Sequence, residues 1–147
     1  MKLAIRRLYG QNDWDWFNSH LPVLRVEDTT GVVAMDVDTG EMVAACVMDN
    51  FTETSLQCHL LVLRQAALRQ GFIQTCMDIM FNKMGRTVIY GLVPGNNTKA
   101  IRLNNHMGFT EKCRFEGAFK PDEDYIIMEL RKENCAYLPQ PTKTEAA

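Results

Sequence analysis

The residues of this sequence best suited to hold a ligand lie between Asn97 and Phe109. Asn97 follows an apolar, strand-like segment and is a good N-cap, whereas Gly108 can take the left-handed conformation that ends a helix. Ala100 and Leu103 fall on one face of that helix. The side chain of Asn97 can therefore cap this helix.

His59 is the candidate for proton transfer. A histidine side chain titrates near neutral pH, so it can take a proton from an amine directly or through water. A lone histidine in an apolar strand can equally be a core residue. Cys58 precedes it, but strand alternation places neighbouring side chains on opposite faces, so we do not expect a thiol nucleophile. Glu53 and Tyr90 are further candidates without a distinguishing feature.

The elements that position these residues follow from the spacing of apolar residues and turn signals. A short helix beginning at Asn12 or Asp13 and ending near Pro22 carries Trp14, Trp16 and Phe17, which suit core packing, an acceptor pocket or an interface. A second helix spans residues 68–84, with Gly85 as its stop, and a third begins at Asn97. We expect strands over residues 2–9, 31–38, 41–48, 55–63, 87–93, 112–120 and 125–131.

This element order predicts a mixed α/β fold in which helices cover a mostly antiparallel sheet. We expect one domain over residues 1–138. Residues 139–147 are polar and contain two prolines, which predicts a flexible C-terminal tail.

Composition narrows the class of protein further. The chain has 147 residues, of which 46% are hydrophobic and 23% charged, enough for one domain with a core. A net charge of -2 gives no field that attracts nucleic acid or an anionic membrane, and no apolar run is long enough to span a bilayer. The five cysteines form no CxxC pair, which indicates reduced thiols and no metal site. We expect a cytoplasmic protein, monomeric or homodimeric.

The offsets Asn-x-x-Ala-x-x-Leu-(Tyr)-x-x-x-Gly-Phe, matched from Asn97 to Phe109 except at Asn104, resemble those of the GNAT superfamily of N-acetyltransferases. The element order is also similar to that of the GNAT fold, so the resemblance extends to Leu138. Two stretches, 68–72 and 124–135, look like small GNAT proteins encoded by tailed bacteriophages. The resemblance implies a splay between the two central strands of the sheet.

The resemblance also implies acetyl-CoA as the cofactor and CoA as a product. The diphosphate is expected at the loop before the second helix, where Gly71 matches the family's Gln/Arg-x-x-Gly-x-Gly/Ala pattern but Leu68 and Ile73 do not. Arg64 nearby could contribute charge or be a solvated loop cation. The cofactor-binding residues expected from the resemblance are Leu61, Val62, Leu63, Leu68, Arg69, Gln70, Gly71, Phe72, Asn97, Ala100 and Asn104.

Asn104 stands where the family has the Tyr that protonates the leaving thiolate. Asparagine can donate a hydrogen bond but cannot supply that proton, so His59 and Asn104 are the candidate catalytic residues. Two function classes remain. The first is direct acetyl transfer to an unidentified amine acceptor in a ternary complex. The second is a weakly active or inactive protein of this fold that binds acyl-CoA, a bacterial host protein, or both.

Overall fold

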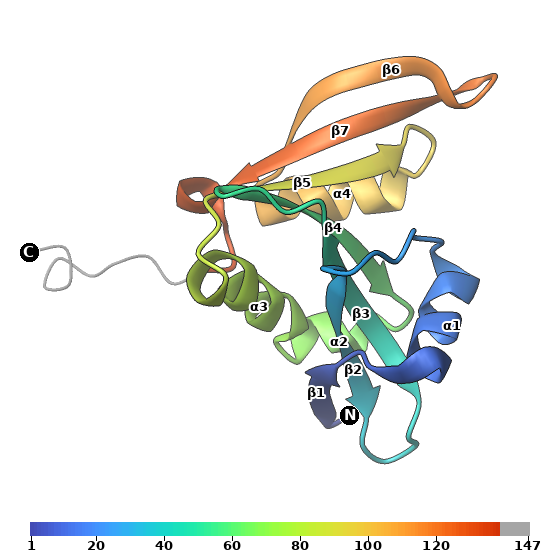
Figure 1. Ribbon diagram of the computed structural model, residues 1–147, viewed down its shortest axis with the longest axis vertical. Helices are drawn as coiled ribbons and strands as arrows, with labels where there is room; N and C mark the ends of the chain where they lie inside the picture. Colours follow the sequence, from blue (N-terminus) through green and yellow to red (C-terminus); the bar gives the residue numbers. More distant parts are fainter. Residues whose placement is uncertain (139–147) are drawn as a thin grey trace, which may run out of the picture.

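The computed structural model describes residues 1–138, and the predicted tail lies outside them (Figure 1). The strands are β1 (Leu3–Arg7), β2 (Thr30–Asp36), β3 (Met42–Asp49), β4 (Ser55–Val62), β5 (Val88–Pro94), β6 (Thr110–Lys120) and β7 (Glu123–Arg131). The helical segments are α1 (Gly10–His20), α2 (Ala66–Arg69), α3 (Phe72–Met77), η1 (Asp78–Lys83), α4 (Thr98–Met107) and η2 (Lys132–Asn134). No helix within residues 1–138 is long and apolar enough to cross a membrane.

One sheet contains these strands in the order β1-β2-β3-β4-β5-β7-β6. Neighbouring strands within the described residues are antiparallel except β4 and β5, which run parallel. These two pair at only three positions, from Ser55 opposite Val88 to Gln57 opposite Tyr90, and then diverge. The predicted mixed α/β fold, with a mostly antiparallel sheet and a splay between its central strands, is confirmed.

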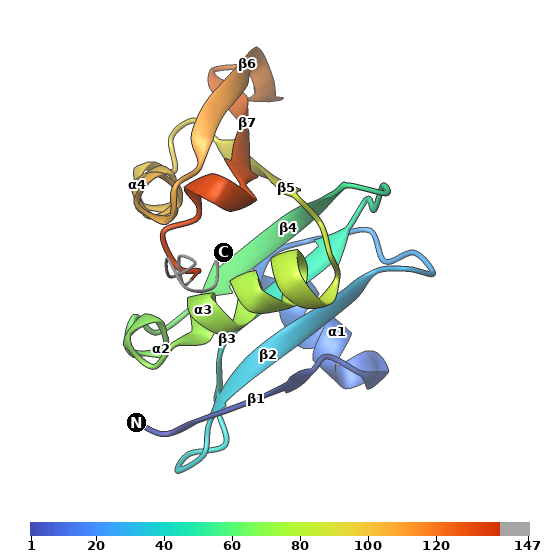
Figure 2. The same cartoon turned by 90° about the vertical axis from the view of Figure 1, so that its left-hand side faces the viewer.

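Helices cover both faces of the sheet, and each face has its own core (Figure 2). On one face, α3, η1 and α4 bury apolar side chains such as Phe72 and Met80 against the strands. On the other face, α1 buries Trp14 and Phe17 against β2 and β3. Because these two aromatic side chains are only 3% and 0% exposed, they belong to the core and not to a pocket or interface.

Helix α1 begins at Gly10, earlier than the predicted start at Asn12 or Asp13. The Asp13 carboxylate accepts a hydrogen bond from the backbone N–H of Tyr9 at 2.9 Å. It also accepts two from the Arg6 guanidinium, at 2.6 Å and 3.1 Å. Asp13 therefore anchors the first turn of α1 to β1, a role that depends on a neighbouring strand and has no signal in the local sequence.

The single helix predicted over residues 68–84 is wrong, because the chain breaks at Gly71. The short helix α2 ends at Arg69, and Gly71 has a left-handed φ of 85° that re-aims the chain into α3. Helix α3 continues into the π-helical turns of η1 and ends before Gly85. The apolar spacing runs through the break, so periodicity alone could not locate it.

Candidate active site

A cavity of about 650 Å³ opens where β4 and β5 diverge. Its walls are the diverging ends of the two strands, side chains of α3 and α4, the end of α1 and the β6–β7 hairpin. Both faces of the sheet contribute side chains, because the strands that would close the gap do not pair there. The predicted residues that line it are His59, Leu61, Val62, Asn97, Ala100 and Asn104.

Helix α4 forms as the spacing predicts. The Oδ1 atom of Asn97 accepts a hydrogen bond from the backbone N–H of Ala100 at 3.1 Å, so this side chain caps the helix. Gly108 ends it with a φ of 111°, and a Cβ atom there would lie 2.1 Å from the carbonyl oxygen of Asn134. Only glycine satisfies both constraints. The cap and the glycine thus fix where α4 begins and ends beside the cavity.

His59 lies in β4 with its Nε2 atom 2.9 Å from both carboxylate oxygens of Asp49 in β3. The two side chains are 20% and 10% exposed, so the pair is largely removed from water. With the Nε2 proton donated to Asp49, the Nδ1 lone pair is available to a ligand. Asp49 was not singled out from the sequence, although an acidic residue ending an apolar strand is a usable signal.

The cysteine next to His59 faces the other side of β4, toward the core under α3. Contact with the Cys46 thiol, together with burial, raises the pKa of the Cys58 thiol well above its ordinary value. Cys58 therefore stays protonated at neutral pH and is a poor nucleophile.

Asn104 lines the cavity from α4, and its Nδ2 atom donates to the sulfur of Met128 at 3.5 Å. A thioether is a weak acceptor, so this bond places only a small constraint on the side chain. Of the other candidates, Glu53 is exposed in the loop between β3 and β4, and Tyr90 lies outside the cavity. Burial, followed by the neighbouring Glu129, raises the pKa of Tyr90.

The predicted diphosphate loop has open space at Gly71. It has fewer side-chain cations available to bind phosphate than the sequence suggests. A Cβ atom added at Gly71 would meet nothing closer than the Gln74 side-chain oxygen at 4.0 Å. Arg64 is not a free cation, because its Nη1 atom lies 3.2 Å from Asp36 and 3.5 Å from Glu41. Arg69 and Gln70 are exposed on the turn before Gly71.

Six of the residues expected to bind the cofactor do not line the cavity: Leu63, Leu68, Arg69, Gln70, Gly71 and Phe72. The side chain of Phe72 is fully buried in the core, so only its backbone is available to a ligand, and its role stays a prediction. Leu68 packs against the same core. Leu63 is 42% exposed beyond the end of β4 and outside the cavity. The end of β4, helix α2 and the start of α3 set the direction of these three side chains. The spacing of residues along the sequence does not predict that direction.

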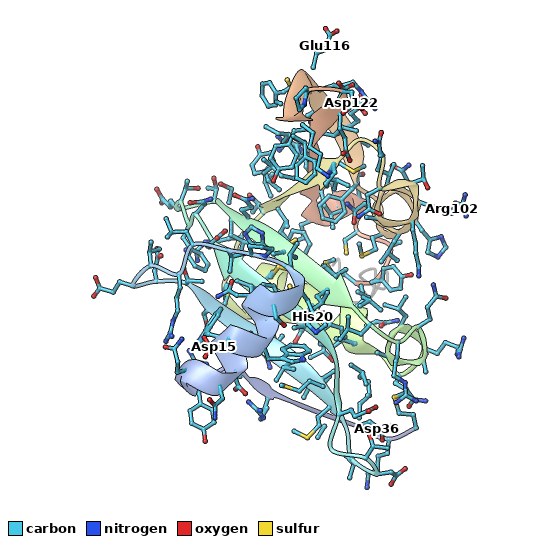
Figure 3. All side chains as sticks on the ribbon, turned by 90° about the vertical axis from the view of Figure 1, so that its right-hand side faces the viewer. Asp15, His20, Asp36, Arg102, Glu116 and Asp122 are labelled. Carbon is cyan, nitrogen blue, oxygen red and sulfur yellow. The ribbon has the colours of Figure 1, made fainter. Side chains whose placement is uncertain are left out.

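Two side chains of the hairpin, Phe119 and Tyr125, also line the cavity and were missed by the sequence analysis. Their ring centroids are 5.4 Å apart. Figure 3 shows α1 with His20 in front of the lower strands and the hairpin, marked by Glu116 and Asp122, above them. The hairpin reaches the cavity through long-range strand pairing, which leaves no local sequence signal.

No protein-family model matches the sequence, and no curated protein shows significant sequence similarity to it. Solved structures of N-acetyltransferases are nevertheless similar. The spermidine/spermine N-acetyltransferase SpeG from Vibrio cholerae, in complex with manganese ions, has a TM-score of 0.71 at 15% identity, covering 88% of this chain and 92% of that one. A candidate phosphinothricin N-acetyltransferase has a TM-score of 0.71 at 18% identity, covering 88% of this chain and 98% of that one.

The likeness extends over most of the described chain. This protein therefore has the fold of the GNAT N-acetyltransferases.

Proposed function

We propose that this protein transfers an acetyl group from acetyl-CoA directly to a primary amine. The observation that carries the proposal is the His59–Asp49 pair at the wall of a cavity where two parallel strands diverge. A cavity alone would suit any ligand. A histidine held by a buried carboxylate beside it adds a group that can remove a proton.

The donor site would be built from three features of the chain. Between Cys58 and Val62, the edge of β4 that faces β5 has no strand partner within residues 1–138, so its backbone groups can bond the amides of pantetheine. Gly71 leaves open space at the start of α3, where N–H groups can bind a diphosphate. Arg69 and Gln70 precede that glycine and can reach phosphate oxygens.

In the proposed reaction acetyl-CoA supplies a thioester carbonyl carbon that a neutral amine can attack. His59 accepts a proton from the amine through Nδ1, and Asp49 holds the imidazole in place through Nε2. A C–N bond forms and the C–S bond breaks, which gives the N-acetylated amine and CoA. The thiolate takes its proton from water, because Asn104 can only donate a hydrogen bond to it.

A weakly active protein of this fold that binds acyl-CoA or a bacterial host protein is the other interpretation of Asn104. The His59–Asp49 pair favours the enzyme, since a binding protein has no need for an oriented imidazole at the cavity wall.

The first prediction tests the donor site directly. Acetyl-CoA and CoA are expected to raise the melting temperature, because a ligand that binds only the folded state stabilises it by mass action. Differential scanning fluorimetry with each ligand up to millimolar concentration measures the shift, with adenosine as a control for nonspecific stabilisation. No shift at millimolar ligand would remove acetyl-CoA from the proposal.

A further inference from the structure

The cavity lining includes residues from the end of α1 and from the β6–β7 hairpin. The first group is His20, Leu21 and Pro22, and the second is Phe119 and Tyr125. We call these five residues the acceptor mouth. Leu21 packs in the core of the α1 face together with Leu61 of β4, which places this side of the mouth beside His59.

The acceptor mouth is apolar and aromatic. Phe119 is 43% exposed although its ring lies 5.4 Å from that of Tyr125 and is tilted by 47° to it. Exposed aromatic rings that converge on a cavity gain free energy by stacking on a planar or apolar group. Leu21 and Pro22 add apolar side chains to the same lining.

Charge in the cavity excludes two common kinds of acceptor. Among the described residues, its lining contains no Asp, Glu or Arg, and its one lysine, Lys99, comes from α4. Asp49 lies behind His59 and is engaged by it. A polyamine would find no carboxylate in the lining for its second ammonium group. An amino acid would find no Lys or Arg among the five residues of the acceptor mouth for its carboxylate, because Lys99 belongs to α4. Burying such a charge without a partner is costly.

We propose that the acceptor is a primary amine joined by a short linker to an aromatic or similarly sized apolar group that carries no second charge. This inference rests on the proposed acetyl transfer and adds the substrate class. The amine points toward His59, and the ring lies between Phe119 and the end of α1.

The test compares four amines as substrates of the full chain: 2-phenylethylamine, tryptamine, spermidine and glutamate. The N-acetylated products are quantified by mass spectrometry at saturating acetyl-CoA. We expect kcat/KM for both arylalkylamines to exceed that for spermidine and glutamate by about tenfold or more, the discrimination typical of an apolar pocket. Equal or greater kcat/KM for spermidine or glutamate would overturn the inference while leaving acetyl transfer intact.

Two matched variants locate the ring. Phe119→Ala should raise KM for 2-phenylethylamine about fivefold or more and leave KM for acetyl-CoA unchanged. Phe115→Ala should leave both KM values unchanged, since Phe115 is on the same strand and 45% exposed but does not line the cavity. Equal effects of the two substitutions, or no effect of the first, would overturn the placement of the acceptor.

Binding without turnover separates this inference from the proposed function. Tryptamine is titrated calorimetrically into the CoA-saturated protein, where no acetyl group is present. Binding that Phe119→Ala weakens supports the acceptor mouth even if no amine is acetylated, in which case only the proposed activity fails. Absence of tryptamine binding while spermidine binds would overturn the acceptor class.

Discussion

The imidazole of His59 is held through one nitrogen, which leaves the other free to act on a ligand. Sequence reasoning could propose His59 because histidine is the residue suited to proton transfer at neutral pH. It could not pair His59 with Asp49, since the contact depends on the register of β3 against β4, in which Asp49 lies opposite Gln57. The sequence therefore indicates His59 as a candidate but does not predict the orientation of its ring.

Replacing His59 tests its role as a base. His59→Gln should lower turnover about 10²-fold or more, the usual contribution of a general base, and leave acetyl-CoA affinity nearly unchanged. Asp49→Asn should give a smaller loss in kcat, because it weakens the orientation of the ring. Steady-state kinetics with calorimetric acetyl-CoA binding measures both, and His106→Gln on α4 is the control. Full activity of folded His59→Gln would make His59 a core residue only.

Asn104 supplies the second prediction at this scale. If the thiolate leaves without a general acid, Asn104→Tyr should raise turnover, by about 10²-fold when the hydroxyl is well placed. Asn104→Ala should leave acetyl-CoA affinity nearly unchanged, because the bond from Nδ2 to the Met128 sulfur is weak. Acetyl transfer and CoA release are measured from neutral to alkaline pH for all three proteins. A fast wild type that collapses in Asn104→Ala would show that Asn104 is itself catalytic.

At the scale of elements, the segments whose ends are set by local residues were the most predictable. Helix α4 begins and ends where Asn97 and Gly108 require, because a cap and a left-handed glycine act on the adjacent turn. The break at Gly71 was missed because glycine was assigned to the phosphate loop while the apolar spacing carried the helix through it. At Gly71 the ability of glycine to take a left-handed φ favours a break, whereas the apolar periodicity predicts a continuous helix. The structure has the break.

Gly71 allows an element-level test of the donor site. Gly71→Glu should weaken acetyl-CoA binding at least tenfold, because it places a carboxylate and a Cβ where a diphosphate would approach the start of α3. Gly85→Glu is the matched control: Gly85 also has a left-handed φ, 71° against 85°, and open space around it, but it follows η1. Calorimetry on both variants, after a check of folding by circular dichroism, compares their affinities. Equal affinities would move the phosphate site elsewhere.

For the whole molecule, the sequence predicted the architecture because composition and element order together allow few arrangements of one domain. The cavity was predictable only through the resemblance, since it exists where two strands fail to pair. The two hairpin aromatics and the anchoring of α1 by Asp13 depend on contacts between distant segments. Such contacts follow from the folded sheet and have no counterpart in the spacing of neighbouring residues.

Low pH should decrease the free energy of unfolding of the whole molecule, in part through Asp13. Hydrogen bonds from Arg6 and then from the Tyr9 backbone, opposed by burial, lower the pKa of this carboxyl in the folded state. The stabilisation is thus complete above the unfolded-state pKa of about 4 and is lost as pH falls through the lower folded-state value. Asp13→Asn should lower the free energy of unfolding by about 1 to 2 kcal/mol at pH 7.

Urea unfolding from pH 7 to pH 2.5 measures this difference, which should shrink as the pH falls. The control is Asp15→Asn in the same helix, because Asp15 bonds only the exposed Gln11 side chain within the described residues. A difference between wild type and Asp13→Asn that is independent of pH would contradict the assignment.

The β4–β5 junction, with three paired positions, is the shortest pairing in the sheet, although one apolar core lies against the strands on both sides of it. Strands β1 to β4 and strands β5 to β7 each assemble mainly from sequence neighbours, which favours rapid local folding, whereas joining them requires the chain to close over α2, α3 and η1. This junction has the fewest paired backbone positions in the sheet. A ligand bound in the splay would contact both strands, so its binding energy would add to the core contacts that join the two sides.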